Sequence, residues 1–122
     1  MFTFTRMYSD PSGESHFDDI EVHFESVNYT DGAPPLNLSE ITAATHVKFM
    51  EAPAGWSSDW HTSSARTLFI VISGEWEVTV SDGESRRFAI GSVILVENTT
   101  GVGHTSRITS VDGSLAAMIQ LE

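Results

Sequence analysis

Histidine is the residue type best suited to catalysis in this sequence, because the chain contains five histidines and no cysteine. The lack of cysteine excludes disulfides, iron–sulfur clusters, thiolate metal sites and a cysteine nucleophile. A neutral imidazole can act as a general base or as a hydrogen-bond partner of a bound molecule. The five are His16, His23, His46, His61 and His104.

Other catalytic patterns are weakly represented. Residues 99–103 are rich in Gly and Thr like a phosphate-binding loop, but neither a Lys nor a helix accompanies them. Ser63 and Ser64 lie near His61 in the sequence, yet nothing marks the strand-to-helix turn that presents a serine nucleophile. No pair of carboxylates is indicated for glycoside hydrolysis. These reaction classes are not expected.

The composition indicates one small acidic domain. The chain has 122 residues, with 17 Asp and Glu against six Lys and Arg, and a net charge of −11. This balance argues against binding to nucleic acid or to an anionic membrane surface. The longest apolar runs, residues 68–72 and 93–96, are far too short for a membrane span. The first residues lack the pattern of a signal peptide, so we expect a cytoplasmic protein.

Short β-strands account for most of the sequence pattern. Residues 20–29 alternate between apolar and polar, and Pro34-Pro35 separates them from the rest of the chain, which predicts an N-terminal arm over residues 1–40 with one strand. Asp82-Gly83 predicts a hairpin in the remainder. Strands are expected there at residues 42–51, 66–73, 75–80, 86–90, 92–96, 104–111 and 115–121. This pattern predicts an all-β barrel or sandwich over residues 41–122.

Two spaced groups of glycines and histidines occur between residues 55 and 108. Gly55 is followed after five residues by His61, and Gly74 closes this first group. Gly91 opens the second group, in which Gly101-Val102-Gly103-His104 keeps a Gly-x2-His spacing. This arrangement resembles the two motifs of the cupin superfamily and covers about half of the chain. The resemblance implies an all-β double-stranded β-helix, or jelly-roll barrel, over residues 41–122.

The same resemblance bears on metal binding. In metal-binding cupins the ligands are two His and one Glu from the first motif and one His from the second. His61 and His104 match two of these positions, whereas Ser63 and Thr67 replace the other two. Hydroxyls are poor ligands for Fe, Mn, Zn or Ni, so a site for a divalent transition metal would need another donor. Two carboxylates are candidates for this third ligand, namely Asp59 and Glu97.

The alternative to a metal centre is a metal-free pocket that binds a small organic molecule. Candidates for its lining are His46, Trp60, Ser63, Thr67 and Phe69. His61 and His104, which the resemblance points to, would then be the catalytic residues of an enzyme and would act by hydrogen bonding or proton transfer. Three functions stay open: an enzyme with metal-assisted or histidine-mediated chemistry, a non-catalytic ligand-binding protein, and a structural dimer with a degenerate site.

Association of two copies is expected for a physical reason. Residues 66–73 are apolar on both faces of the predicted strand, and the strand of the arm has no local partner. A homodimer in which the arms exchange would give each arm strand a pairing partner and would cover the apolar strand at residues 66–73. Arg66 is expected to form an ion pair within this acidic chain, and Trp76 is expected to pack in the core.

Overall fold

A computed structural model describes residues 1–122 as eleven β-strands without a helix. The strands are β1 (Phe2–Ser9), β2 (Ser15–Val22), β3 (Glu25–Val27), β4 (Leu36–Leu38), β5 (Ala44–Ala52), β6 (Thr67–Ser73), β7 (Trp76–Val80), β8 (Ser85–Phe88), β9 (Val93–Val96), β10 (His104–Ile108) and β11 (Ser114–Leu121). The expected all-β jelly-roll class is confirmed. The chain has no helix that is long and apolar enough to cross a membrane.

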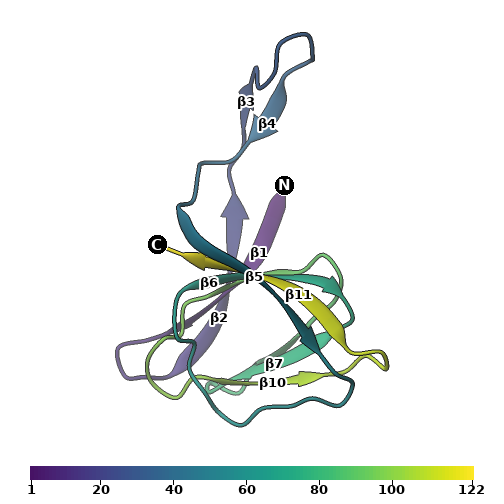
Figure 1. Cartoon of the computed structure of the whole chain (residues 1–122). Helices are drawn as coiled ribbons and strands as arrows, with labels where there is room; N and C mark the ends of the chain where they lie inside the picture. The colour runs from purple at the N-terminus through teal and green to yellow at the C-terminus, as the bar shows by residue number, and fades with distance from the viewer.

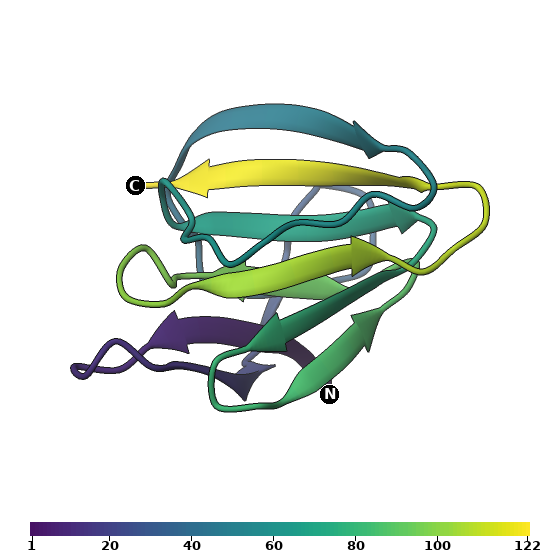
Figure 2. The same cartoon turned by 90° about the horizontal axis from the view of Figure 1, so that it is seen from below.

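Two sheets build the barrel. The larger sheet has the order β2-β1-β9-β6-β11-β5, and the smaller sheet has the order β10-β7-β8. Figure 1 shows β5, β6 and β11 on one side of the barrel and β7 and β10 on the other, and Figure 2 shows the same strands from below. Neighbouring strands are antiparallel except β1 and β9, which run parallel.

The core lies between the two sheets. In β7, Trp76, Val78 and Val80 are buried, while the alternate residues Glu77 and Thr79 are partly exposed. This period of two is what a strand with one face on the core requires. The expected packing of Trp76 in the core is confirmed. The buried apolar cluster consists of Met7, Phe17, Ala52, Val71, Trp76, Val78, Val80, Phe88, Ile94 and Ile108.

The first 22 residues do not form the arm that the sequence predicts. β1 and β2 are two strands of the larger sheet, and β1 pairs with β9 through Thr5 opposite Ile94. The prediction of an arm with a single strand at residues 20–29 is therefore wrong over this part. A parallel partner so far along the chain leaves no local turn signal, whereas the Pro pair gave a strong one. β2 ends at Val22, and the next strand is the short β3.

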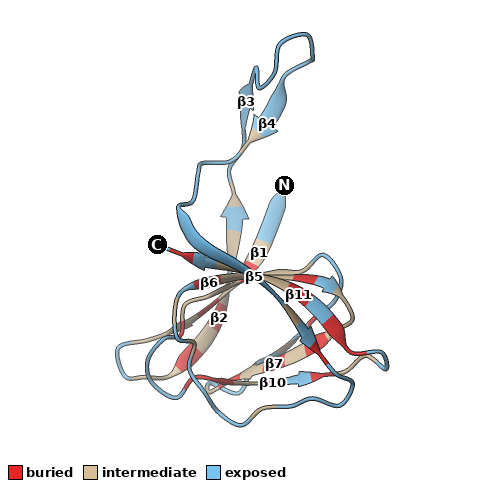
Figure 3. Ribbon diagram, viewed as in Figure 1, coloured by how far each residue is buried: buried red, intermediate tan, exposed pale blue.

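The segment that stands apart is the hairpin of β3 and β4. It projects beyond β5, β6 and β11, on the side of the barrel opposite β7 and β10 (Figure 1). Every residue from 23 to 49 except Leu38 is exposed, as Figure 3 shows. An isolated two-stranded hairpin is at best marginally stable in water.

Candidate functional site

His61 and His104 lie directly opposite each other at the end of the barrel. The backbone N–H of His61 donates to the carbonyl of His104 at 3.0 Å, and that of His104 donates to the carbonyl of His61 at 2.8 Å. The centroids of the two imidazoles are 4.4 Å apart, with their planes tilted by 56°. Gly103 permits this approach, because its φ is +84° and a side chain there would collide with the backbone of His61. The pairing inferred from the motifs is thus present in the structure.

One hydrogen bond at Nδ1 orients each ring. The Nδ1–H of His61 donates to the backbone carbonyl of Asp59 at 2.9 Å. The amide Nδ2 of Asn98 donates to Nδ1 of His104 at 2.7 Å. In these tautomers, neutral His61 has a free lone pair at Nε2, and neutral His104 carries its proton at Nε2. The pair can therefore accept a hydrogen bond from a bound hydroxyl and donate one to it, and His61 can take up its proton as a general base.

Asn98 is a site residue that the motif spacing does not reveal. Its side chain is fully buried, and its Oδ1 has no hydrogen-bond partner. Its backbone carbonyl accepts the N–H of Ser63 at 3.1 Å. Asn98 thereby connects the ring of His104 to the loop that carries His61. The available sequence signal is its position between a strand and a Gly-rich turn, where Asn commonly forms local hydrogen bonds.

The buried environment keeps His104 uncharged. Burial, together with a smaller contribution from repulsion by His61, lowers the pKa of His104 from 6.5 to about 4. The whole residue is only 7% exposed. At neutral pH this ring is consequently a hydrogen-bonding group and cannot serve as the counter-ion of an acid.

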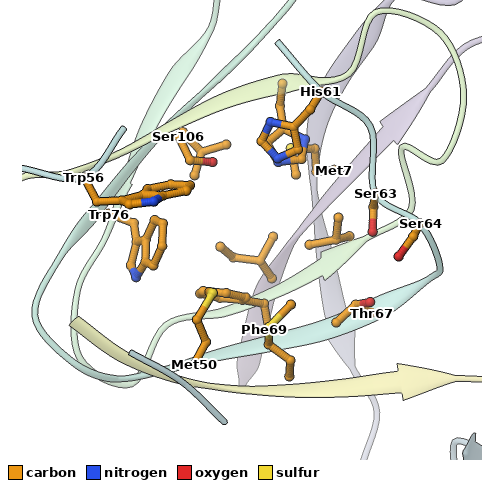
Figure 4. Close-up of a pocket in the computed structure, with 15 residues that line it drawn as sticks. Met7, Met50, Trp56, His61, Ser63, Ser64, Thr67, Phe69, Trp76 and Ser106 are labelled. Atoms are coloured by element: carbon orange, nitrogen blue, oxygen red, sulfur yellow. The ribbon is translucent and has the colours of Figure 1, made fainter. Parts of the chain in front are cut away.

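A cavity of about 260 Å³ opens beside the two histidines. Nine of its 15 lining residues are hydrophobic, and none is Asp, Glu, Lys or Arg. Trp76 packs edge-on against Trp56 and Phe69, with ring centroids 5.6 and 5.5 Å apart. Figure 4 shows the two indoles on one side of the cavity and the hydroxyls of the loop on the other. The lining consists of Met7, Met50, Trp56, His61, Ser63, Ser64, Thr67, Phe69, Trp76, Val78, Ile94, Val96, His104, Ser106 and Met118.

The cavity contains most of the residues that the sequence predicts for the site, namely His61, Ser63, Thr67, Phe69 and His104. Trp60 was predicted to line the pocket, but it is not among the lining residues of this cavity and is 49% exposed. Trp56, four residues earlier, lines the cavity instead. His46 lines a neighbouring groove rather than the cavity itself, because it lies nearer the beginning of β5 than Met50 does.

Comparisons with known proteins bear on the fold. No protein-family model matches the sequence, and neither does any curated protein. Among solved structures, the conserved protein SPY1581 of unknown function from Streptococcus pyogenes is 20% identical with a TM-score of 0.46, and the match covers 62% of each chain. Protein NMB1881 from Neisseria meningitidis is 17% identical with a TM-score of 0.47, covering 82% of this chain and 83% of that one.

A third solved structure is the cupin domain of Cnp3 from Schizosaccharomyces pombe. It is 16% identical with a TM-score of 0.50, and the match covers 88% of this chain and 73% of that one. This chain has the cupin fold. The resemblance of the two motifs to those of cupins is confirmed at the level of fold.

The motif positions of this protein do not assemble a metal centre. No group of three or more His, Cys, Asp or Glu side chains is placed to hold a metal ion. Asp59 and Glu97, the predicted third ligands, are both absent from the cavity lining. Two imidazoles provide fewer protein donors than the three of a catalytic zinc site. The donor set therefore does not fit a transition metal.

Glu97 has a different role in this protein. Arg6 donates to Oε1 at 2.6 Å and Arg66 donates to Oε2 at 2.7 Å. Burial acts to raise the pKa of Glu97, but the hydrogen bonds and charges of these arginines outweigh it and hold the pKa below its ordinary value. The expected ion pair of Arg66 is confirmed. Glu97 joins β1 to the residues just before β6 and is not available to the cavity.

Proposed function

We propose that this cupin binds one small organic molecule in the barrel cavity, with its apolar body against the aromatic wall and a polar group at His61 and His104. The observation that carries the proposal is the lining of the cavity. It is mostly apolar, and two imidazoles, those of His61 and His104, face each other beside it. Pockets for small molecules are typically apolar with a few polar groups that fix orientation.

The size of the cavity limits the ligand. An engineered cavity of about 150 Å³ holds benzene, so the volume here suits a molecule of about ten non-hydrogen atoms. Trp56, Trp76 and Phe69 favour a ring, because aromatic pairs prefer edge-on or offset packing. Three methionines give the rest of the wall a flexible surface that adapts to ligand shape, namely Met7, Met50 and Met118.

The experiment is a calorimetric titration with hydrocinnamyl alcohol, a phenyl ring on a three-carbon chain that ends in a hydroxyl. We expect binding to the unmodified protein and a three- to tenfold loss of affinity in His61→Ala, about the value of one hydrogen bond. His23→Ala is the matched control, because His23 is exposed and does not line the cavity. The proposal fails if the alcohol does not bind, or if His61→Ala and His104→Ala both retain full affinity.

We also propose that two copies of this cupin associate through the outer face of the larger sheet. On this face, strand register aligns apolar residues in rows across four strands. One row consists of Val47, Ile119, Leu68 and Leu95, and the next consists of Phe49, Ala117, Ile70 and Val93. Phe49 is 75% exposed and Val47 is 63% exposed. Within these four strands neither row contains a charged residue, and Arg6 on β1 lies opposite Leu95 at the edge of the first row.

A second copy is the partner that fits this face. Four strands at about 4.8 Å and rows about 7 Å apart give a patch of a few hundred Å², about a third of the roughly 800 Å² that one side of a standard interface buries. The hairpin of β3 and β4 stands on the same side of the barrel and exposes further apolar residues, namely Phe24, Val27, Tyr29 and Leu36. Reciprocal contacts of two hairpins with two sheets would supply the remaining area and stabilise both hairpins.

The mass in solution tests this association. By light scattering at tens of micromolar, we expect twice the 13.3 kDa of one chain. Phe49→Glu places a charge in the patch and should give the mass of one chain. Val111→Glu is the control, because Val111 is 87% exposed in the turn between β10 and β11, outside the patch. A single-chain mass for the unmodified protein would refute the dimer.

A further inference from the structure

Lys48 is the one Lys or Arg side chain of this protein that forms no ion pair. The other Lys and Arg residues all pair with Asp or Glu, namely Arg6, Arg66, Arg86, Arg87 and Arg107. The chain has 17 acidic residues and only six basic ones, so a lone ammonium is notable in it. An unpaired cation on an acidic protein is a candidate partner for an anionic group of a ligand.

Lys48 lies in a groove that continues the barrel cavity. The groove has a volume of about 320 Å³ and is mostly polar, with three hydrophobic residues among nine. It shares four lining residues with the cavity: Ser63, Ser64, Thr67 and Met118. In Figure 4 the three hydroxyl residues stand on the side of the cavity away from Trp56 and Trp76. The groove thus opens from the polar side of the cavity.

Strand register explains how the lining changes from apolar to polar. Along the inner face of β11, Ala116 is buried, Met118 lines both the cavity and the groove, and Gln120 lines the groove alone. In the adjacent β5, Lys48 lies opposite Met118, and His46 lies opposite Gln120. A ligand that runs along these two strands therefore passes from an apolar space to a cationic one.

The groove also offers hydrogen-bond donors that the protein does not use. Ser63 and Thr67 donate their hydroxyl protons to the backbone carbonyl of Ala65, at 2.6 and 3.1 Å. Other polar side chains of the groove have no hydrogen-bond partner within the protein, namely Lys48, Ser64 and Gln120. An ammonium, a hydroxyl and an amide are all suitable donors to a carboxylate.

We propose that the ligand of this cupin is a small carboxylic acid with a second polar group: its carboxylate lies in the groove against Lys48, its apolar body occupies the cavity, and the second polar group meets His61 and His104. This inference rests on the proposed function of the cavity. The cavity lining contains no Lys or Arg, and burying a carboxylate among Trp56, Trp76 and Phe69 would carry a large desolvation cost. In the groove the carboxylate stays partly hydrated and gains charge-assisted hydrogen bonds. Lys48 would thus be a specificity-determining residue.

The test compares 3-(4-hydroxyphenyl)propionate with 3-(4-hydroxyphenyl)propan-1-ol, which differ only in the terminal group and share a phenol hydroxyl as the second polar group. By calorimetry at low salt, we expect the unmodified protein to bind the carboxylate about three- to fivefold more tightly, the range expected for a partly exposed charge pair. Lys48→Met keeps the apolar stem and should abolish this preference. Lys48→Arg should retain most of it. Arg87→Met is the matched control, because it lowers the net charge equally at a site outside both cavity and groove.

The outcomes separate this inference from the proposal beneath it. If both compounds bind equally to the unmodified protein and both weaken in His61→Ala, the cavity is a binding site but the carboxylate inference is wrong. If the preference for the carboxylate survives in Lys48→Met, Lys48 is not the residue that favours the charged ligand over the neutral one, and the inference is also wrong. If neither compound binds, the proposed function itself fails.

Discussion

Acid should destabilise this protein through His104. In the folded state the pKa of this ring is lowered to about 4 by burial and by the neighbouring His61, whereas the unfolded value is near 6.5. Above pH 6.5 the ring is neutral in both states and contributes no pH dependence. As the pH falls from 6.5 towards 4, the unfolded chain binds a proton that the folded chain does not, so unfolding becomes more favourable.

The magnitude is set by the gap between the two pKa values. A difference of one pKa unit corresponds to about 1.4 kcal/mol, so the gap between 6.5 and about 4 amounts to about 3 kcal/mol of lost stability at pH 4. Domains of this size have a free energy of unfolding of about 5–15 kcal/mol, so the effect is a substantial share of the total.

Urea unfolding followed by tryptophan fluorescence measures this effect in the unmodified protein and in His104→Gln. The variant keeps a polar side chain that can meet Asn98 but has no titrating ring. Groups that titrate away from the histidine pair affect both proteins alike, so the difference between the two pH profiles isolates His104 together with its coupling to His61. We expect the free energy of unfolding to fall by about 3 kcal/mol more in the unmodified protein between pH 6.5 and 4. Parallel profiles, or an NMR titration that gives His104 a pKa near 6.5, would refute the reasoning.

Two further predictions concern other parts of the chain. The imidazole of His16 forms hydrogen bonds with Asp10 at 2.7 Å and with Asp82 at 2.8 Å, and these bonds raise the pKa of His16 above 6.5. The stabilising effect of His16 should be complete below pH 6.5 and should disappear as the pH rises through the raised pKa. Asp10→Asn should lower the pKa of His16 in an NMR titration. Gly103→Ala should destabilise the protein by about 1–3 kcal/mol more than Gly83→Ala. Both glycines have a positive φ, but only a side chain at position 103 would meet the backbone of His61. Equal losses of unfolding free energy in urea would show that this contact is unimportant.

The motif spacing predicted the fold and the pair of histidines because local chemistry fixes both. Gly103 and His104 keep a spacing that a tight turn before a strand requires, and the opposite loop brings His61 into register. Thr67 was predictable because it stands at a ligand position of the first motif, and Phe69 follows two residues later on the same face of β6. Where a residue's position depends on its own strand or turn, the sequence was informative.

Long-range pairing was not predictable in the same way. β1 joins β9 in parallel, and no turn signal connects segments so distant in the chain. The partner of Glu97 was unpredictable for the same reason, because its carboxylate forms an ion pair with Arg6 on the distant strand β1 and does not face the cavity. Asn98 was missed because its importance lies in one buried contact with His104, which has no pattern of its own.

The central claim is that the barrel cavity is a binding site, and the indole N–H signals of the protein test it most directly. Of the three tryptophans, Trp56 and Trp76 line the cavity and Trp60 does not. In a proton–nitrogen NMR titration with hydrocinnamyl alcohol, we expect saturable shifts of the Trp56 and Trp76 signals while that of Trp60 stays in place. If none of the three signals moves, or if all three move together without saturation, the cavity is not a specific binding site.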